Sequence, residues 1–226
     1  GTATVVGGDS AKKISDEINK SSDVTGVKAD ARTGVELSGL ASAGNVSMTL
    51  GAGSNTATIS ANITNTSDLT NLANSINAQS GKTGITAALT NNNANIKLVN
   101  EAGEDITIDN FAIAGATTGT VAVLKTMAYD GSITGSAVNL TVDTTTPANT
   151  NDAARIQGQV QIEASGAFQV SASVANMVSA NTLEVSKLTS VADIDISSQD
   201  GAQNAISVID AAIAVVHQRA SAIGAP

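Results

Sequence analysis

SSQDGAQNAISVIDAAIAVVHQRASAIG, residues 197–224, carries a heptad pattern of small and aliphatic side chains. The repeating positions, four and three residues apart in turn, are Ala202, Ile206, Ile209, Ile213, Val216, Ala220 and Ile223. This spacing places them on one stripe of an α-helix, facing a partner helix. A second row widens the stripe: Ala205, Val208, Ala212, Val215 and Ala222. We call the first row the seam, and we predict that it packs in a bundle or a coiled-coil-like contact.

Signals at both ends set the bounds of this helix, which we predict from residue 198 to about residue 223. Ser197 followed three residues later by Asp200 resembles a capping box, and an acidic residue in the first turn suits the helix dipole. Arg219 suits the last turn, while Gly224 and Pro226 provide a stop. The alternative is an ordinary amphipathic core helix, but no other stretch of the chain predicts a comparable helix to cover the seam.

The N-terminal part of the chain contains an internal repeat, in which matching residues lie 58 positions apart. Ile18-Asn19 is followed by TGVKA at 25–29, and Ile76-Asn77 is followed by TGITA at 83–87. Each copy predicts a short amphipathic helix, a Thr-Gly turn and a strand. Asp9 or Ser10 is expected to cap the first helix and Ser67 or Asp68 the second. Gly26 and Gly84 are expected to adopt positive φ at the helix-to-strand connection.

Alternating apolar residues predict β-strands after each copy. We predict hairpins over 46–63 and 85–98, strands near 106–108, 121–123 and 138–142, and a third hairpin over 156–172. The sequence therefore predicts an α+β chain with a boundary in the linker 144–151, which contains Pro147. Residues 1–150 would form a β-rich module with the two repeats, at about 9–50 and 67–110. Residues 151–226 would form the third hairpin and the long helix.

Composition excludes several classes of protein. Hydrophobic residues make up 42% of the 226, so the chain is not typically disordered. The net charge is −9, and only 11 Lys and Arg are scattered along the chain, which argues against binding nucleic acid or an anionic membrane. No stretch predicts a transmembrane span or a signal peptide. Cysteine is absent, which excludes disulfides and thiolate metal sites.

No catalytic constellation is present in the sequence, so we predict a protein that is not an enzyme and has no cofactor or metal. The only histidine, His217, falls on the predicted polar face of the last helix, and one histidine cannot complete an HExxH zinc motif. Gly51-Ala52-Gly53 lacks the lysine of a phosphate-binding loop. Asp193 and Asp195 lack the further ligands and the glycine of a calcium loop.

Two segments resemble bacterial flagellins. IDISSQDGA at 194–202, AISVIDAA at 205–212 and QRASAIGA at 218–225 look like the carboxy-terminal signature region of that family. The repeated Ile-Asn and Thr-Gly-Val/Ile segments resemble the flagellin IN motif. The resemblance covers about the last thirty residues and two stretches of about twenty.

This resemblance implies an α+β fold with a β-rich variable outer domain, plus a long C-terminal α-helix of a coiled-coil-like core domain. It implies an internal fragment, because flagellins carry long N-terminal helices before this stretch and a terminal helix after it. Those N-terminal helices and other flagellin subunits would be the partners of the seam. In the full-length family members an innate immune receptor reads the N-terminal helices together with the C-terminal one.

The resemblance also implies a function and a place: a structural subunit that self-assembles into the extracellular flagellar filament for motility. A hook–filament junction protein is an alternative, because it shares the terminal-helix pattern. A surface glycan-binding adhesin is a second alternative, motivated by the acidic, Asn- and Thr-rich β region. The aromatic content of 1% argues against sugar stacking.

Overall fold

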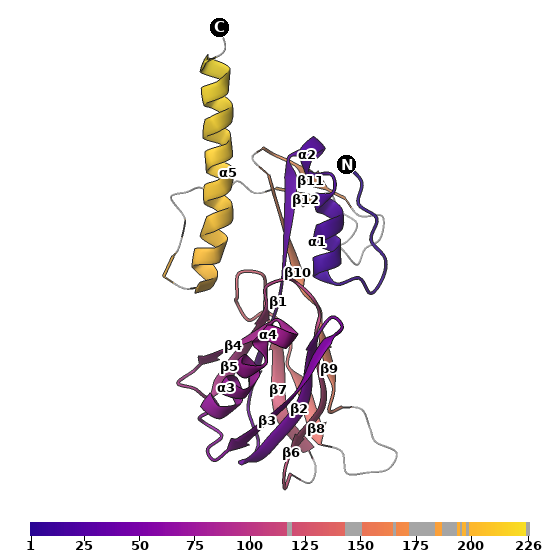
Figure 1. The fold of residues 1–226 in the computed structure, drawn as a ribbon, viewed down its shortest axis with the longest axis vertical. Helices are drawn as coiled ribbons and strands as arrows, with labels where there is room; N and C mark the ends of the chain where they lie inside the picture. Colours follow the sequence, from indigo (N-terminus) through magenta and orange to yellow (C-terminus); the bar gives the residue numbers. More distant parts are fainter. Residues whose placement is uncertain are drawn as a thin grey trace. The chain divides into compact units, whose positions relative to one another are not determined.

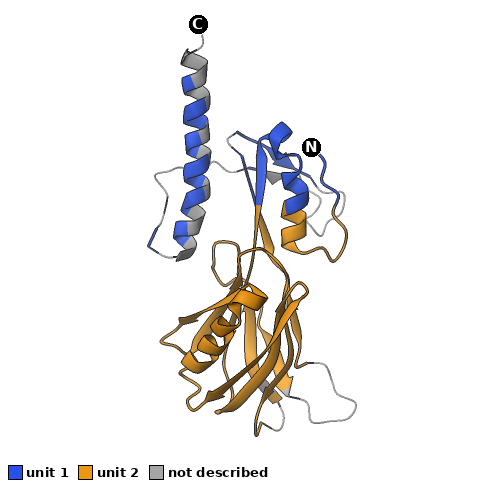
Figure 2. Cartoon of the chain, in the orientation of Figure 1, with its two compact units in different colours: residues 1–4, 16–29, 161–226 blue, residues 5–15, 30–160 orange. Residues whose placement is uncertain are grey.

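The computed structural model describes residues 1–116, 119–142, 151–164, 166–171, 184–186, 194, 196–197 and 199–224. The chain divides into two compact units (Figure 2). Unit 1 comprises residues 1–4, 16–29 and 161–226, and unit 2 comprises residues 5–15 and 30–160. The linker predicted at 144–151 lies almost wholly outside the described residues, so the boundary near residue 150 stays a prediction.

Two antiparallel sheets form most of the described β-structure (Figure 1). The first has the order β3-β2-β6-β9, with strands Asn55–Ile63, Gly44–Ala52, Ile106–Ile113 and Ala154–Ile156. The second has the order β4-β5-β1-β7-β8, with strands Ile85–Thr90, Asn95–Asn100, Val27–Ser38, Gly119–Thr126 and Val138–Val142. β10, Gln159–Ala164, also pairs with β1.

Helices are short outside the C-terminal segment. α1, Ala11–Asn19, and α2, Ser22–Thr25, precede β1, whereas α3, Thr70–Ala78, and α4, Ser80–Thr83, precede β4. The described part of the chain is therefore α+β and rich in strands with short helices, as predicted. α5, Gln199–Gly224, occupies the position predicted for the long helix. The predicted capping box stays a prediction, because the side chain of Asp200 is outside the described set.

Two of the three predicted hairpins are present. β2 pairs with β3 around a turn where Gly53 has φ +58°, and β4 pairs with β5 around Asn91, Asn92 and Asn93, all with positive φ. The third prediction, a hairpin over 156–172, is wrong for the described strands. β10 pairs with β1 instead, and β11, Gln169–Val170, pairs with β12, Glu184–Val185. The twelve-residue β1 is long enough to take several partners, and that non-local pairing overrides the local turn signal.

One apolar core of unit 2 draws side chains from both sheets and from α3. Its fully buried members are aliphatic except for Phe111 and Met48. Alternate residues of β2 and β3 point inward to this core. The largest fully buried side chains are Phe111, Leu37, Met48, Leu50, Ile59, Ile63, Leu69, Leu72, Ile76, Ile85, Ile96 and Leu98. Small and branched side chains fill this core without an aromatic cluster.

The two copies of the sequence repeat have the same local structure. Each runs from a nine-residue helix through a four-residue helix to a strand, with Gly26 at φ +67° and Gly84 at φ +69° closing the short helix. The expected positive φ is thus present in both copies. Ser10 accepts a hydrogen bond from the Lys13 N–H (3.4 Å), as an N-cap does. At the start of α3, the hydroxyl and N–H of Thr70 both donate to Asp68 and lower the pKa of its carboxyl.

The asparagine of each copy bridges to the backbone of the following strand. The Asn19 side-chain amide donates to the carbonyl of Ala29 (2.7 Å) and accepts from its N–H (2.8 Å). Asn77 makes the same two bonds with Ala87, at 2.9 and 2.8 Å. Ten residues separate the partners in both copies, so one sequence signal encodes one geometry twice.

Replacement of Gly103 by Ala is expected to lower the free energy of unfolding of unit 2 by about 2 to 4 kcal/mol. Gly103 has φ +73°, and an added Cβ would lie 2.3 Å from the Cβ of buried Ala31. Gly115→Ala is the matched control, because Gly115 also has positive φ (+88°) but would meet nothing within 4 Å. Urea denaturation of both variants measures the difference, and equal losses would contradict the role of the clash.

Candidate assembly surface on the C-terminal helix

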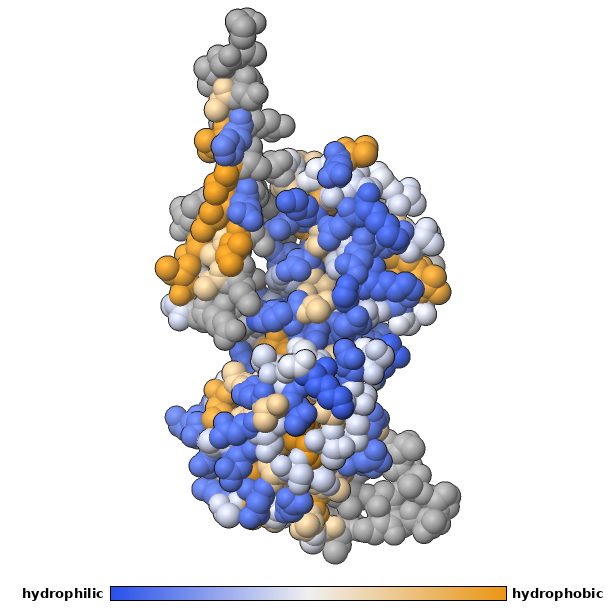
Figure 3. All heavy atoms as spheres, viewed as in Figure 1, coloured by the Kyte–Doolittle hydropathy of each residue, from blue (hydrophilic) through white to orange (hydrophobic). Residues whose placement is uncertain are grey.

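The seam of α5 presents exposed aliphatic side chains. Ile206 is 61% exposed, Ile209 42%, Ile213 49% and Val216 66%. They follow one another at helical steps of three and four residues, so they form a continuous row along the helix (Figure 3). A branched aliphatic side chain left at this exposure forgoes much of the stabilisation that burial provides. Such a row is typical of a surface that a partner covers.

The remaining predicted seam residues extend this row. Ala202 and Ala220 are exposed, so every seam residue whose side chain is described lies at the surface. The side chain of Ile223 is outside the described set. In the second row, Ala205 is buried, at 5% exposure, and Val208, Ala212 and Val215 are half-buried. The described side chains of the second row are therefore buried or half-buried, whereas those of the seam are exposed.

Charge is sparse on this surface. Ile209, Ala212, Ile213 and Val216 line a shallow hollow together with His217, and Asp210 is exposed on the same helix. His217, predicted on the polar face, thus borders the apolar row. The helix contains no other ionisable residue between Asp210 and His217. A surface of this composition favours contact with another apolar helix face over contact with an ion or a polar ligand.

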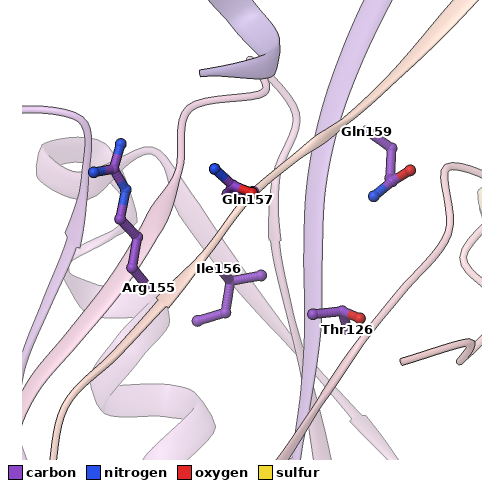
Figure 4. Close-up of a pocket in the computed structure, with 5 residues that line it drawn as sticks. All are labelled: Thr126, Arg155, Ile156, Gln157 and Gln159. Carbon is purple, nitrogen blue, oxygen red and sulfur yellow. The ribbon is translucent and has the colours of Figure 1, made fainter. Parts of the chain in front are cut away.

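A second hollow, of about 450 Å³, lies in unit 2 and does not form a convincing ligand site. It is lined by Thr126, Arg155, Ile156, Gln157 and Gln159, whose side chains do not converge on one point (Figure 4). The guanidinium of Arg155 is held by the carboxylate of Asp105, at 2.7 Å from Nε and 2.6 Å from the terminal nitrogen. Its charge is therefore already compensated.

Metal and membrane sites receive no support from the described residues. No three or more His, Cys, Asp or Glu side chains gather there in a way that could hold a metal ion. Among the helices described, none is both long and apolar enough to cross a membrane.

The comparison with curated proteins finds a flagellin. No protein-family model matches the chain. The chain is 34% identical to B-type flagellin from Pseudomonas aeruginosa strain PAO1, and the match covers 98% of this chain. The chain spans 43% of the length of that protein. It is a distant homologue of B-type flagellin along nearly all of its own length, as its terminal segment and its repeats predicted.

Among solved structures, the chain is matched to the D1-D2-D3 domains of the flagellar cap protein FliD from Escherichia coli. The match covers 88% of this chain and 71% of that chain, with 14% identity and a TM-score of 0.25. A TM-score this low supports no statement about the fold.

Proposed function

We propose that this chain, a homologue of B-type flagellin over 98% of its length, is part of a structural subunit of the bacterial flagellar filament. It acts by self-assembly in motility, outside the cell, and not as an enzyme. The observation that carries the proposal is the homology, which runs through both the repeats and α5. The open seam of α5 supplies a surface on which such assembly can act.

The proposed mechanism is burial of the seam against neighbouring helices. Ile206, Ile209, Ile213 and Val216 are each roughly half exposed, and covering them would stabilise the contact by roughly 4 kcal/mol for each helix. Partners with heptad seams of their own would interlock with these side chains in coiled-coil fashion. The partners we propose are other flagellin subunits and the N-terminal helices of the full-length subunit.

The proposed division of labour follows the two parts of the sequence. Residues 151–226 contribute the C-terminal helix to a coiled-coil-like core domain, and residues 1–150, with the two repeats, form the variable outer domain. The outer domain is suited to solvent, since its exposed strand residues are mostly Thr, Ser and Asn. Recognition of the full-length subunit by an innate immune receptor belongs to the same proposal.

Immunogold electron microscopy on the source bacterium tests the proposal directly, with antibody raised against this chain. We expect label along the whole length of the filament. Label confined to the junction of hook and filament would replace this proposal with a junction protein. Label on the cell envelope alone would replace it with a surface adhesin. A strain in which the gene is deleted provides the control for antibody specificity.

A further inference from the structure

α3 lies against one edge strand of each sheet of unit 2. It packs against β3 and β4 (Figure 1). Among the described strands, β3 pairs only with β2, and β4 pairs only with β5. Each therefore has one side whose backbone N–H and C=O groups have no strand partner. Such free edges are templates for pairing with another chain.

Polar side chains of α3 occupy backbone groups on both edges. On β3, the Asn71 side-chain amide donates to the carbonyl of Asn62 (3.0 Å), and the Ser75 hydroxyl donates to the carbonyl of Ser60 (3.0 Å). Asn62 and Ser60 are two residues apart, so their carbonyls point in the same direction from the strand. The side chains of α3 thus donate to two carbonyl groups on the side of β3 that faces away from β2.

On β4, the side-chain amide of Asn77 forms hydrogen bonds with both backbone groups of Ala87. Its amide donates to the Ala87 carbonyl (2.9 Å) and accepts from the Ala87 N–H (2.8 Å), as a residue of a neighbouring strand would. Both groups of Ala87 therefore face away from β5. Alternation places the backbone groups of Ile85 on the same free side, where the Ile85 N–H donates to the Thr83 hydroxyl (3.2 Å).

The apolar face of α3 explains how the helix stays in this position. Leu72 and Ile76 are fully buried and Ala73 nearly so, whereas Asn71 and Asn77 are exposed beside them. Burial anchors the helix, and the polar residues at its margins meet the strand edges. Asparagine is unfavourable both in an apolar core and in the interior of a helix. Its hydrogen bonds to the strand edges explain why it occurs at these positions.

The first repeat copy has only part of this arrangement. Asn19 bridges to Ala29 as Asn77 does to Ala87. The positions equivalent to Asn71 and Ser75 are Lys13 and Glu17, which pair with Asp9 and Lys20 near their own helix. The ion pairs of Lys13 and Glu17 therefore do not repeat the bonds that Asn71 and Ser75 make to β3.

We propose that α3 seals one edge of each sheet of unit 2, through Asn77 on β4 and through Asn71 and Ser75 on β3, against strand pairing with a second copy of this chain. The inference goes beyond the proposed function, because it concerns a contact that the fold prevents. Crowding of copies makes such protection necessary, since exposed edges in close proximity pair readily.

The first experiment uses Asn77→Ala in the 226-residue chain. We expect concentration-dependent self-association in analytical ultracentrifugation and about tenfold faster hydrogen exchange at the Ala87 amide in dilute samples. Asn74→Ala is the matched control: it makes the same change on the same helix, at an exposed residue whose side chain makes no hydrogen bond to the described residues. It is expected to behave as the unmodified chain.

A second change identifies the edge involved. Proline at position 87 lacks the N–H that an added strand needs, and this N–H faces away from β5, so the β4–β5 pairing survives. Asn77→Ala combined with Ala87→Pro is expected to return to the unassociated state. For the β3 edge, Asn71→Ala with Ser75→Ala is expected to associate, and Asn62→Pro is expected to reverse it.

All variants are also measured with Ile213→Asp, which removes association through α5. Association that persists with Ile213→Asp and is reversed by proline supports the sealing role, whatever the outcome for the filament. If Asn77→Ala and the double variant remain folded and unassociated at every concentration, α3 does not seal these edges. Association that proline fails to reverse would equally overturn the proposal.

Discussion

Replacement of Ile213 by Asp in the full-length protein is expected to abolish filament formation. Ile213 lies in the middle of the exposed seam, at 49% exposure, with Ile209 one turn before it and Val216 one turn after it. An assembled seam would enclose this position among aliphatic side chains, where an unpaired carboxylate costs several kcal/mol. The isolated chain should tolerate the change, because the carboxylate can remain in water. Ile209→Asp is expected to have the same effect for the same reason.

The measurement is electron microscopy of filaments on cells that express each variant, together with circular dichroism of the 226-residue chain. Ala214→Asp is the matched control, because the heptad pattern places residue 214 on the face opposite the seam. It introduces the same charge into the same helix, and its filaments should be normal. Normal filaments from either seam variant would refute the assembly role of this row.

The helix face that carries the seam could be predicted from sequence because that information is local, whereas the assembly role of the seam stays a prediction. Steps of three and four residues define one face of a helix wherever that helix packs. The exposure of Ile206 and Val216 agrees with a row that has no cover within the described chain. The partner that covers the seam could not be predicted in this way, because periodicity identifies the apolar face of a helix but not the surface it packs against.

Sheet topology could be predicted less well. The alternation in β2, β3, β4 and β5 gave the two hairpins, since a short turn joins each pair. β1 pairs with β5 and with β7, which are distant in sequence, and nothing in an alternating pattern selects one distant strand over another. The same ambiguity made the hairpin over 156–172 wrong.

The sequence repeat contains a signal for the backbone contacts of its asparagines as well as for its helices and strands. Matching Ile-Asn pairs predicted a helix and a strand in each copy, and Gly26 and Gly84 predicted the left-handed turn between them. The role of the asparagine was missed, although its recurrence at Asn19 and Asn77 was the signal. A polar residue repeated next to a buried isoleucine indicates a specific backbone contact, because amphipathic patterning alone requires no particular polar side chain.

The same repeat provides the second large prediction. Replacement of Ile76 by Ala is expected to lower the free energy of unfolding by about 2 to 5 kcal/mol, whereas Ile18→Ala should cost about 1 to 2 kcal/mol. The two isoleucines occupy equivalent positions in helices of equal length. Ile76 is fully buried in the core between the sheets, so truncation leaves a cavity among close-packed side chains. Ile18 is half-buried, and water can fill the space it leaves.

Urea denaturation followed by circular dichroism and by fluorescence of Tyr129, the only tyrosine, measures both changes. Each variant is its partner's control, because the chemical change and the local helix are the same. A cost for Ile18→Ala equal to that for Ile76→Ala would mean that the first helix is as well packed as the second. The sequence alone predicts equal costs, since the two copies share one pattern. The different surroundings of α1 and α3 predict unequal ones, because packing and not pattern sets the free energy of burial.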